Sequence, residues 1–94
     1  MTNYAITHAV CARLALGQGD GERAQQWANS AIDYAFQTDT PDVRAEAKLE
    51  LARVLSALGR RDQALSAARE GLAIHEAKGD RPGMAEAQAL LDQL

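Results

Sequence analysis

The chain has 94 residues, a formal net charge of −3, two prolines and an aromatic content of only 4 %. About a fifth of the residues are alanine, and this composition favours helix over sheet in one domain with a modest core. Acidic and basic residues alternate without a basic patch, which argues against nucleic acid or an anionic membrane surface as a partner. The single cysteine excludes an internal disulfide. No stretch approaches the ~20 apolar residues of a membrane span, and no signal-peptide pattern is present, so the cytoplasm is the expected location.

The first predicted helix covers about residues 4–16 and is apolar on more than one side. Such a helix usually has more than one neighbour. The glycine-rich segment 17–21 breaks it, because glycine readily takes the positive φ angles at which helices end. Asp20 is a suitable N-cap for a second helix over about residues 22–37.

The second predicted helix carries three of the bulkiest side chains, which are Trp27, Tyr34 and Phe36. We interpret them as the fillers of an otherwise alanine-lined core, and only secondarily as a ligand-facing patch.

The break at 38–41 ends the second predicted helix and precedes the third. Thr40 can cap the third helix, and Pro41 fits its first turn, where its missing N–H costs nothing.

The third and fourth predicted helices, about residues 42–58 and 62–77, form the clearest unit. Each carries an apolar stripe at helical spacing: Val43, Ala47, Leu51, Leu55 and Leu58 on the third, and Ala64, Ala68, Gly71, Leu72 and His75 on the fourth. Because only the break at 59–61 separates them, they must pack antiparallel as a hairpin. Small residues allow a close approach of the two backbones: Ala52, Ala64, Ala68 and Gly71. His75 is expected to be a core histidine with a polar edge.

A fifth helix is predicted after the break at 79–81, where Asp80 and Pro82 open it. Its apolar stripe consists of Met84, Ala87, Leu91 and Leu94.

The sequence also repeats itself forty positions apart: Gly59 aligns with Gly19, Ala64 with Ala24, Ala68 with Ala28 and Leu72 with Ile32. A period of this size is typical of a solenoid. We therefore expect one all-α domain over residues 1–94, with one repeat at about 4–37, a second at about 41–78, and a final helix at about 82–94.

Few residues suggest chemistry. His8 and Cys11 lie three positions apart on one helical turn, but two ligands do not make a zinc site, and no group accompanies them to build a cysteine nucleophile. A packing role is the expected one for both. The glycines of segment 17–21 follow a helix rather than a strand and lack the lysine of a phosphate loop. The sequence thus predicts neither a catalytic site, nor a metal site, nor a cofactor.

The aligned positions resemble tetratricopeptide repeats, which place a small residue within the first helix, a glycine at the turn and an alanine five residues later. The second repeat matches at Ala52, Gly59, Ala64 and Leu72, and the first at Ala12, Gly19, Ala24 and Ile32. The period of forty is longer than the usual ~34 residues, and the family's early aromatic and closing proline are replaced by Lys48 and Glu76. The longer repeat and the Lys78–Asp80 turn are similar to repeats in the C-terminal regions of bacterial ATPase-linked transcriptional regulators and cyclase-fused signalling proteins.

The resemblance implies a superhelix of two helical hairpins plus a final helix, which binds proteins or peptides and has no activity of its own. The first helix of each hairpin would line a concave groove, with these residues facing a partner: Ile6, Ala9, Val10, Arg13, Leu49, Glu50, Arg53, Ala89, Leu90 and Gln93. Arg13 and Arg53 could meet a carboxylate of a peptide or of a small effector. Because about three repeats are needed for a stable stack, the two and a half present here predict a homo-oligomer, most simply a dimer.

Overall fold

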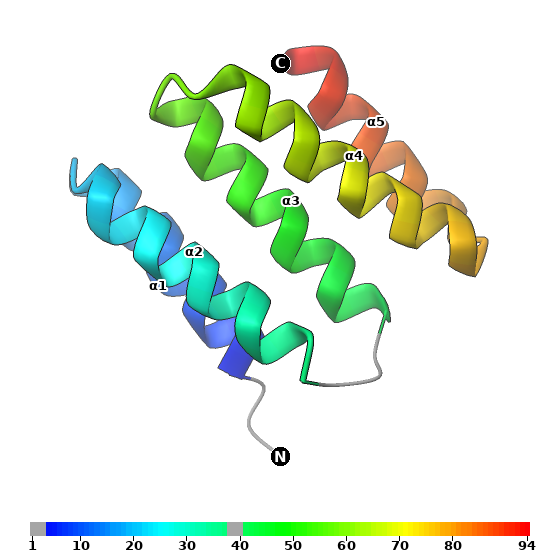
Figure 1. Cartoon of the computed structure of the whole chain (residues 1–94), viewed down its shortest axis with the longest axis horizontal. Coiled ribbons are helices and arrows are strands. Elements are labelled where there is room, and N and C mark those ends of the chain that lie inside the picture. The colour runs from blue at the N-terminus through cyan, green and yellow to red at the C-terminus, as the bar shows by residue number, and fades with distance from the viewer. Residues whose placement is uncertain (1–3, 38–40) are drawn as a thin grey trace.

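The computed structural model describes residues 4–37 and 41–94, and within them it contains five helices and no strand. The helices are α1 (Tyr4–Gly17), α2 (Gly21–Ala35), α3 (Pro41–Ala57), α4 (Arg61–Lys78) and α5 (Arg81–Gln93). Hairpin α1–α2 is followed by hairpin α3–α4 and then by α5. Figure 1 shows α2 in front of α1 and α4 in front of α5. The molecule is a slab with principal extents of 36 × 34 × 17 Å. The predicted all-α fold is confirmed.

The helix ends follow the predicted signals. Gly19, Gly59 and Gly79 each have a positive φ, between 75° and 80°, and each lies within two residues of the end of a helix. This region favours glycine because a Cβ would be strained there. At the other ends, Asp20 and Asp80 accept hydrogen bonds from the backbone N–H three residues later, each at 3.1 Å. The predicted cap at Thr40 lies outside the described residues.

Alanine lines the interior, as the composition suggested, and α3 is the central helix. Three buried clusters lie along it: one with α4 and α5, one with α1 and α2, and one with α2. Half-buried Leu51 packs against the first two, and Leu55 is 3 % exposed. The core of the molecule is thus continuous from one hairpin to the next through α3.

The predicted single stripe on α3 was too narrow. Leu49 and Val54 lie outside that stripe, yet they are the largest fully buried side chains of the described residues. The reason is tertiary, since α3 contacts all four other helices and so buries side chains around most of its circumference.

The predicted close approach within the hairpin α3–α4 is confirmed at Gly71. A Cβ built on this glycine would lie 2.8 Å from Leu49 Cδ2 and 3.2 Å from the carbonyl oxygen of Ala45. Ala52, Ala64 and Ala68 are fully buried in the same hairpin. Leu49 therefore fills the space that a larger residue on α4 would otherwise occupy.

Candidate functional site

A chain of ion pairs joins α1, α3 and α5. Arg13 of α1 lies with both Nε and Nη2 2.8 Å from Oε2 of Glu50, on α3. Arg53 of α3 lies 3.4 Å from the same oxygen and 3.1 Å from Oε1 of Glu86, on α5. Arg13 and Arg53 are forty positions apart, so equivalent arginines of the two repeats lie where α1 meets α3 and where α3 meets α5.

Glu50 is the buried member of this chain. Its side chain is 4 % exposed, whereas that of Arg13 is 64 % exposed. A carboxylate removed from water is costly unless it is paired and hydrogen-bonded, and two guanidinium groups do this here. The hydrogen bond with Glu50, and then its charge, raise the pKa of Arg13 above its ordinary value. Burial, and then the charge of Glu86, raise the pKa of the Glu46 carboxyl. The face therefore combines two arginines that compensate the buried Glu50 charge with a neighbouring pair of carboxylates, Glu46 and Glu86, that repel each other.

The structure divides the predicted groove residues into two groups. Leu49, Glu50 and Leu90 are buried, at 0 %, 3 % and 8 % exposure. This corrects the expectation that these three side chains face an open groove. Leu49 and Leu90 belong to the core cluster shared by α3, α4 and α5, and Glu50 is covered by its ion pair with Arg13 of α1. The others for which exposure is described are half-buried or exposed: Ala9, Val10, Arg13, Arg53, Ala89 and Gln93. The side chain of Ile6 lies outside the described residues.

The outer edge of α1 exposes apolar side chains at positions that the next repeat buries. Val10 is 49 % and Leu14 is 61 % exposed, while their equivalents forty positions later, Glu50 and Val54, are 3 % and 0 % exposed. In Figure 1, α1 and α2 lie at one side of the slab, whereas α3 has helices on both sides. A position that is buried in the middle of the stack is thus open at its N-terminal end.

The aromatic residues of the second helical segment are less buried than predicted. Tyr34 is 37 % and Phe36 is 45 % exposed, so the interpretation of these two as core fillers is wrong. Phe36 follows the last residue of α2 as its C-cap, and it leaves the buried stripe for that reason. The guanidinium of Arg44 and the ammonium of Lys48 lie 5.1 Å and 5.4 Å from its ring centroid. A shallow groove of about 560 Å³ lies there, between Ile32, Asp33, Phe36, Gln37 and Lys48.

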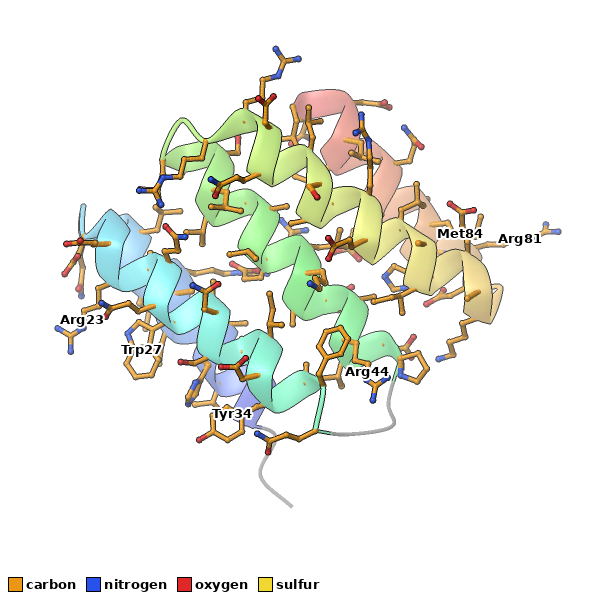
Figure 2. All side chains as sticks on the ribbon, in the orientation of Figure 1. Arg23, Trp27, Tyr34, Arg44, Arg81 and Met84 are labelled. Atoms are coloured by element: carbon orange, nitrogen blue, oxygen red, sulfur yellow. The ribbon has the colours of Figure 1, made fainter. Side chains whose placement is uncertain are left out.

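Trp27 and His8 pack together at the other side of α2. The His8 ring stands edge-on to the rings of Trp27 and Tyr34, with centroids 5.0 Å and 4.8 Å apart. Figure 2 shows Trp27 and Tyr34 projecting from the same side of that helix. Trp27, His8 and Cys11 are each half-buried, and the ring contacts of His8 confirm the packing role expected for it.

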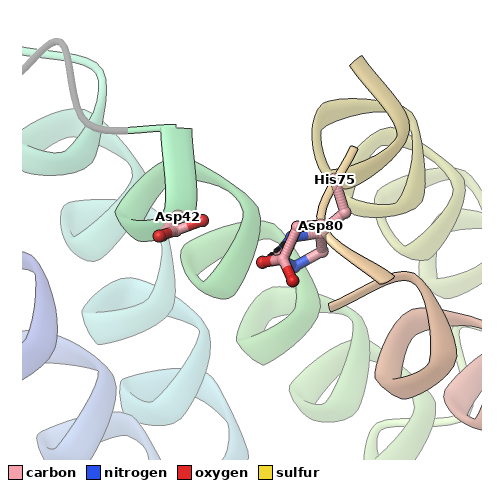
Figure 3. Close-up of side chains that lie close together, drawn as sticks. All are labelled: Asp42, His75 and Asp80. Atoms are coloured by element: carbon pink, nitrogen blue, oxygen red, sulfur yellow. Dashed lines mark ion pairs between the residues drawn. The ribbon is translucent and has the colours of Figure 1, made fainter. Parts of the chain in front are cut away.

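A second cluster of charged groups lies where α3 begins and α4 ends. Asp42, His75 and Asp80 each place a potential ligand atom within 4.8 Å of the others (Figure 3). His75 is 2 % exposed, which confirms that it is a core histidine. Its Nδ1 lies 3.3 Å from Oδ2 of Asp80. Lys78 Nζ lies 2.6 Å from Oδ2 of Asp42, and its hydrogen bond holds the pKa of Asp42 below the ordinary value.

The two-hairpin geometry and its forty-residue offset agree with a comparison against protein families. The tetratricopeptide repeat profile matches residues 5–30 and 45–70, which together make up more than half of the chain. The chain belongs to the tetratricopeptide repeat family. The two matched ranges begin forty residues apart, as the internal alignment of Gly19 with Gly59 requires.

Tetratricopeptide repeats generally mediate protein–protein interaction and are generally non-catalytic scaffolds. Comparisons with curated proteins and with solved structures returned no match. Among the described residues, none of the tetratricopeptide helices is both long and apolar enough to cross a bilayer. The family therefore gives the fold and a general class of partner, and it leaves the particular partner to the geometry of this chain.

Proposed function

We propose that the chain is a non-catalytic protein-interaction module that forms a homodimer through the exposed edge of α1. In this proposal it serves as the regulatory repeat segment of a cytoplasmic bacterial signalling or transcription-regulatory protein, of the kind that its long repeats resemble. Residues 1–94 would act as one domain, with repeats at about 4–37 and 41–78 and a final helix at about 82–94.

The observation that carries the proposal is the exposure of Val10 and Leu14 at positions where the second repeat is buried. A repeat stack buries its apolar faces only against a neighbour. A second copy provides such a neighbour, with the same patch on both subunits around a two-fold axis. Each side chain is about half exposed, so burying both in both copies contributes on the order of 4 kcal/mol. Association itself costs about 4 kcal/mol or more, so a dimer at micromolar concentration must bury further surface along α1 beside these two side chains, and it should be concentration-dependent.

A small effector or peptide bound near Arg13 and Arg53 is the alternative, and it has less support. Both guanidinium groups already contact Glu50, and Arg53 also contacts Glu86. An incoming carboxylate must compete with these partners, one of which is buried and cannot turn to water. Binding of an acidic ligand there would thus expose or strand the Glu50 charge.

Sedimentation equilibrium of the full chain over a micromolar concentration range tests the dimer. The wild-type chain should show a reversible monomer–dimer equilibrium, and Leu14→Glu should shift it to monomer. Phe36→Gln is the matched control, because Phe36 is also an exposed apolar side chain, at 45 %, but belongs to a different face. It should leave the equilibrium unchanged. A wild-type chain that stays monomeric throughout and unfolds in one sharp thermal transition contradicts the proposal.

A further inference from the structure

The cluster at the junction of α3, α4 and α5 has donor atoms suited to a metal ion. Asp42 comes from the first turn of α3, His75 from the last turns of α4, and Asp80 is the N-cap of α5 (Figure 3). Two carboxylates and one imidazole thus converge within 4.8 Å from three separate elements. Two carboxylates at such short range repel each other unless a cation lies near them, and Lys78 provides one beside Asp42.

His75 is the observation that distinguishes this cluster from an ordinary group of acidic residues. Its side chain is 2 % exposed, and within the part of the chain that the structure describes neither ring nitrogen makes a hydrogen bond. Oδ1 of Asp42 is also buried and has no hydrogen-bond partner there. Buried polar atoms of this kind are costly unless something satisfies them.

The surroundings hold the imidazole in an orientation that suits coordination. Nε2 lies 3.8 Å from Oε1 of Glu46, and Nδ1 lies 3.3 Å from Oδ2 of Asp80. Nδ1 thus faces Asp80, one of the three candidate ligands, while the Glu46 carboxylate lies on the Nε2 side of the ring, the side from which a second carboxylate orients a metal-bound histidine. A Cβ on Gly83 would collide with the ring, so the glycine allows α5 to pack directly against the imidazole.

Asp80 divides its two oxygens between a structural role and this cluster. Its Oδ1 accepts the capping hydrogen bond from the Gly83 N–H at 3.1 Å, and its Oδ2 is the oxygen beside His75. The cap therefore aims one carboxylate oxygen at the ring. Asp20, the N-cap of α2, makes the same 3.1 Å hydrogen bond without a histidine beside it.

The fold does not need a histidine at this position. Forty residues earlier, the equivalent of His75 is Ala35, which is fully buried in the first repeat. Alanine therefore satisfies the helix packing at this place in the repeat. The histidine, together with the two aspartates that face it, is therefore an addition specific to the place where α3, α4 and α5 meet.

We propose that Asp42, His75 and Asp80 bind a divalent transition-metal ion, for which Zn²⁺ is the best-suited probe. One imidazole nitrogen and two carboxylates form a borderline ligand set that Zn²⁺ accepts, with water in the fourth position. Mg²⁺ and Ca²⁺ prefer oxygen ligands in greater number. Tetrahedral zinc ligands lie about 3.3 Å apart, so the widest pair in this cluster must close by about 1.5 Å from its 4.8 Å, which rotation of the half-exposed Asp42 side chain can supply.

Lys78 provides the sharpest test, because its Nζ lies 2.6 Å from Oδ2 of Asp42 and neutralises that carboxylate. A metal ion would compete with this ammonium group for the carboxylate. Lys78→Gln should therefore tighten zinc binding several-fold. A purely structural cluster predicts no such gain, since losing Lys78 would only remove a partly exposed ion pair.

The experiment titrates the untagged full chain carrying Cys11→Ser, which removes the single thiol, with Zn²⁺. Calorimetry should show one ion bound per chain, and the thermal midpoint should rise because the folded state binds the metal. Asp42→Asn and Asp80→Asn should each weaken binding at least about tenfold, while Asp20→Asn should have no effect on binding. Asparagine also caps helices, so Asp80→Asn should remain folded.

The chain has two histidines, which allows the binding site to be assigned by NMR. The ring nitrogen resonances of His75 should shift with Zn²⁺ while those of His8 stay unchanged. The proposal is overturned if His8 shifts instead, if both asparagine variants bind zinc like the parent, or if the thermal midpoint does not rise with zinc.

Discussion

The buried Glu50 carboxylate offers a quantitative test of how α1, α3 and α5 are held together. Arg13 and Arg53 both contact it, and its side chain is 4 % exposed. Removing one partner of a buried ion pair usually costs about 3–5 kcal/mol because the other charge is left uncompensated. Here one arginine remains after each single substitution, and the side chain of Arg13 is 64 % exposed. We therefore expect Arg13→Ala to cost about 1–2 kcal/mol, and the double variant with Arg53→Ala about 3–5 kcal/mol.

The opposite result is expected when the charge itself is removed. Forty residues later, the position of Glu50 is occupied by Leu90, which is 8 % exposed and packs in the core. Glu50→Leu should therefore be accommodated by the same repeat geometry. Replacing a buried charge by an apolar residue of similar volume is often neutral or stabilising, so we expect a change within about 1 kcal/mol. On this reasoning the arginines are needed mainly because Glu50 is there.

Urea unfolding followed by circular dichroism at 222 nm measures these differences, at one fixed protein concentration because self-association adds to apparent stability. Glu50→Leu combined with Arg13→Ala should be less destabilised than Arg13→Ala alone. The reasoning is refuted if the double arginine variant loses less than about 0.5 kcal/mol, which would mean that Glu50 is well solvated, or if Glu50→Leu costs as much as that variant, which would mean that the ion pairs themselves stabilise the fold.

Core packing gives further predictions, each measured by urea unfolding. Leu55→Ala and Leu49→Ala should each cost about 2–5 kcal/mol, because their side chains are 3 % and 0 % exposed, whereas Leu14→Ala, at 61 % exposure, should cost less than about 0.5 kcal/mol. Equal losses at all three would mean that the assigned burial is wrong. Gly71→Ala should cost about 1–3 kcal/mol, since the new methyl meets Leu49 and the Ala45 carbonyl. Gly17→Ala, which has nothing within 4 Å and no positive φ, is its control and should be neutral or slightly stabilising.

Local chemistry allowed the helices and their ends to be predicted from the sequence. The glycines with positive φ and the aspartate caps act within four residues of chain, so their effect is visible in the sequence. The burial of Ala24, Ala28, Ala64 and Ala68 also followed from the repeat. What could be predicted were thus the features set by near neighbours and by the forty-residue period.

The ion pairs and the second cluster could not be predicted in the same way. Glu50 was expected to face a groove, but it contacts Arg13, which is 37 residues away in sequence, and only the crossing of α1 over α3 brings them together. Phe36 was misplaced because a residue at a helix C-cap no longer follows the stripe. For His75 one local signal existed: a histidine on the buried stripe five residues before a capping aspartate, Asp80. Its approach to Asp42 depends on the packing of α3 against α4.

The positions that depart from the forty-residue repeat are the ones that suggest specific function. A repeat that only needed to stack could keep alanine at the position of His75, as Ala35 does, and an apolar residue at the position of Glu50, as Leu90 does. The second repeat instead buries a carboxylate at one junction and an imidazole at the other, and both are costly without their partners. At the N-terminal edge the reverse holds, because Val10 and Leu14 stay apolar although they are exposed. Glu50 and His75 thus depart from the repeat, whereas Val10 and Leu14 keep its apolar character at the open end of the stack, so substitutions at Glu50, His75 and Leu14 test the three features one at a time.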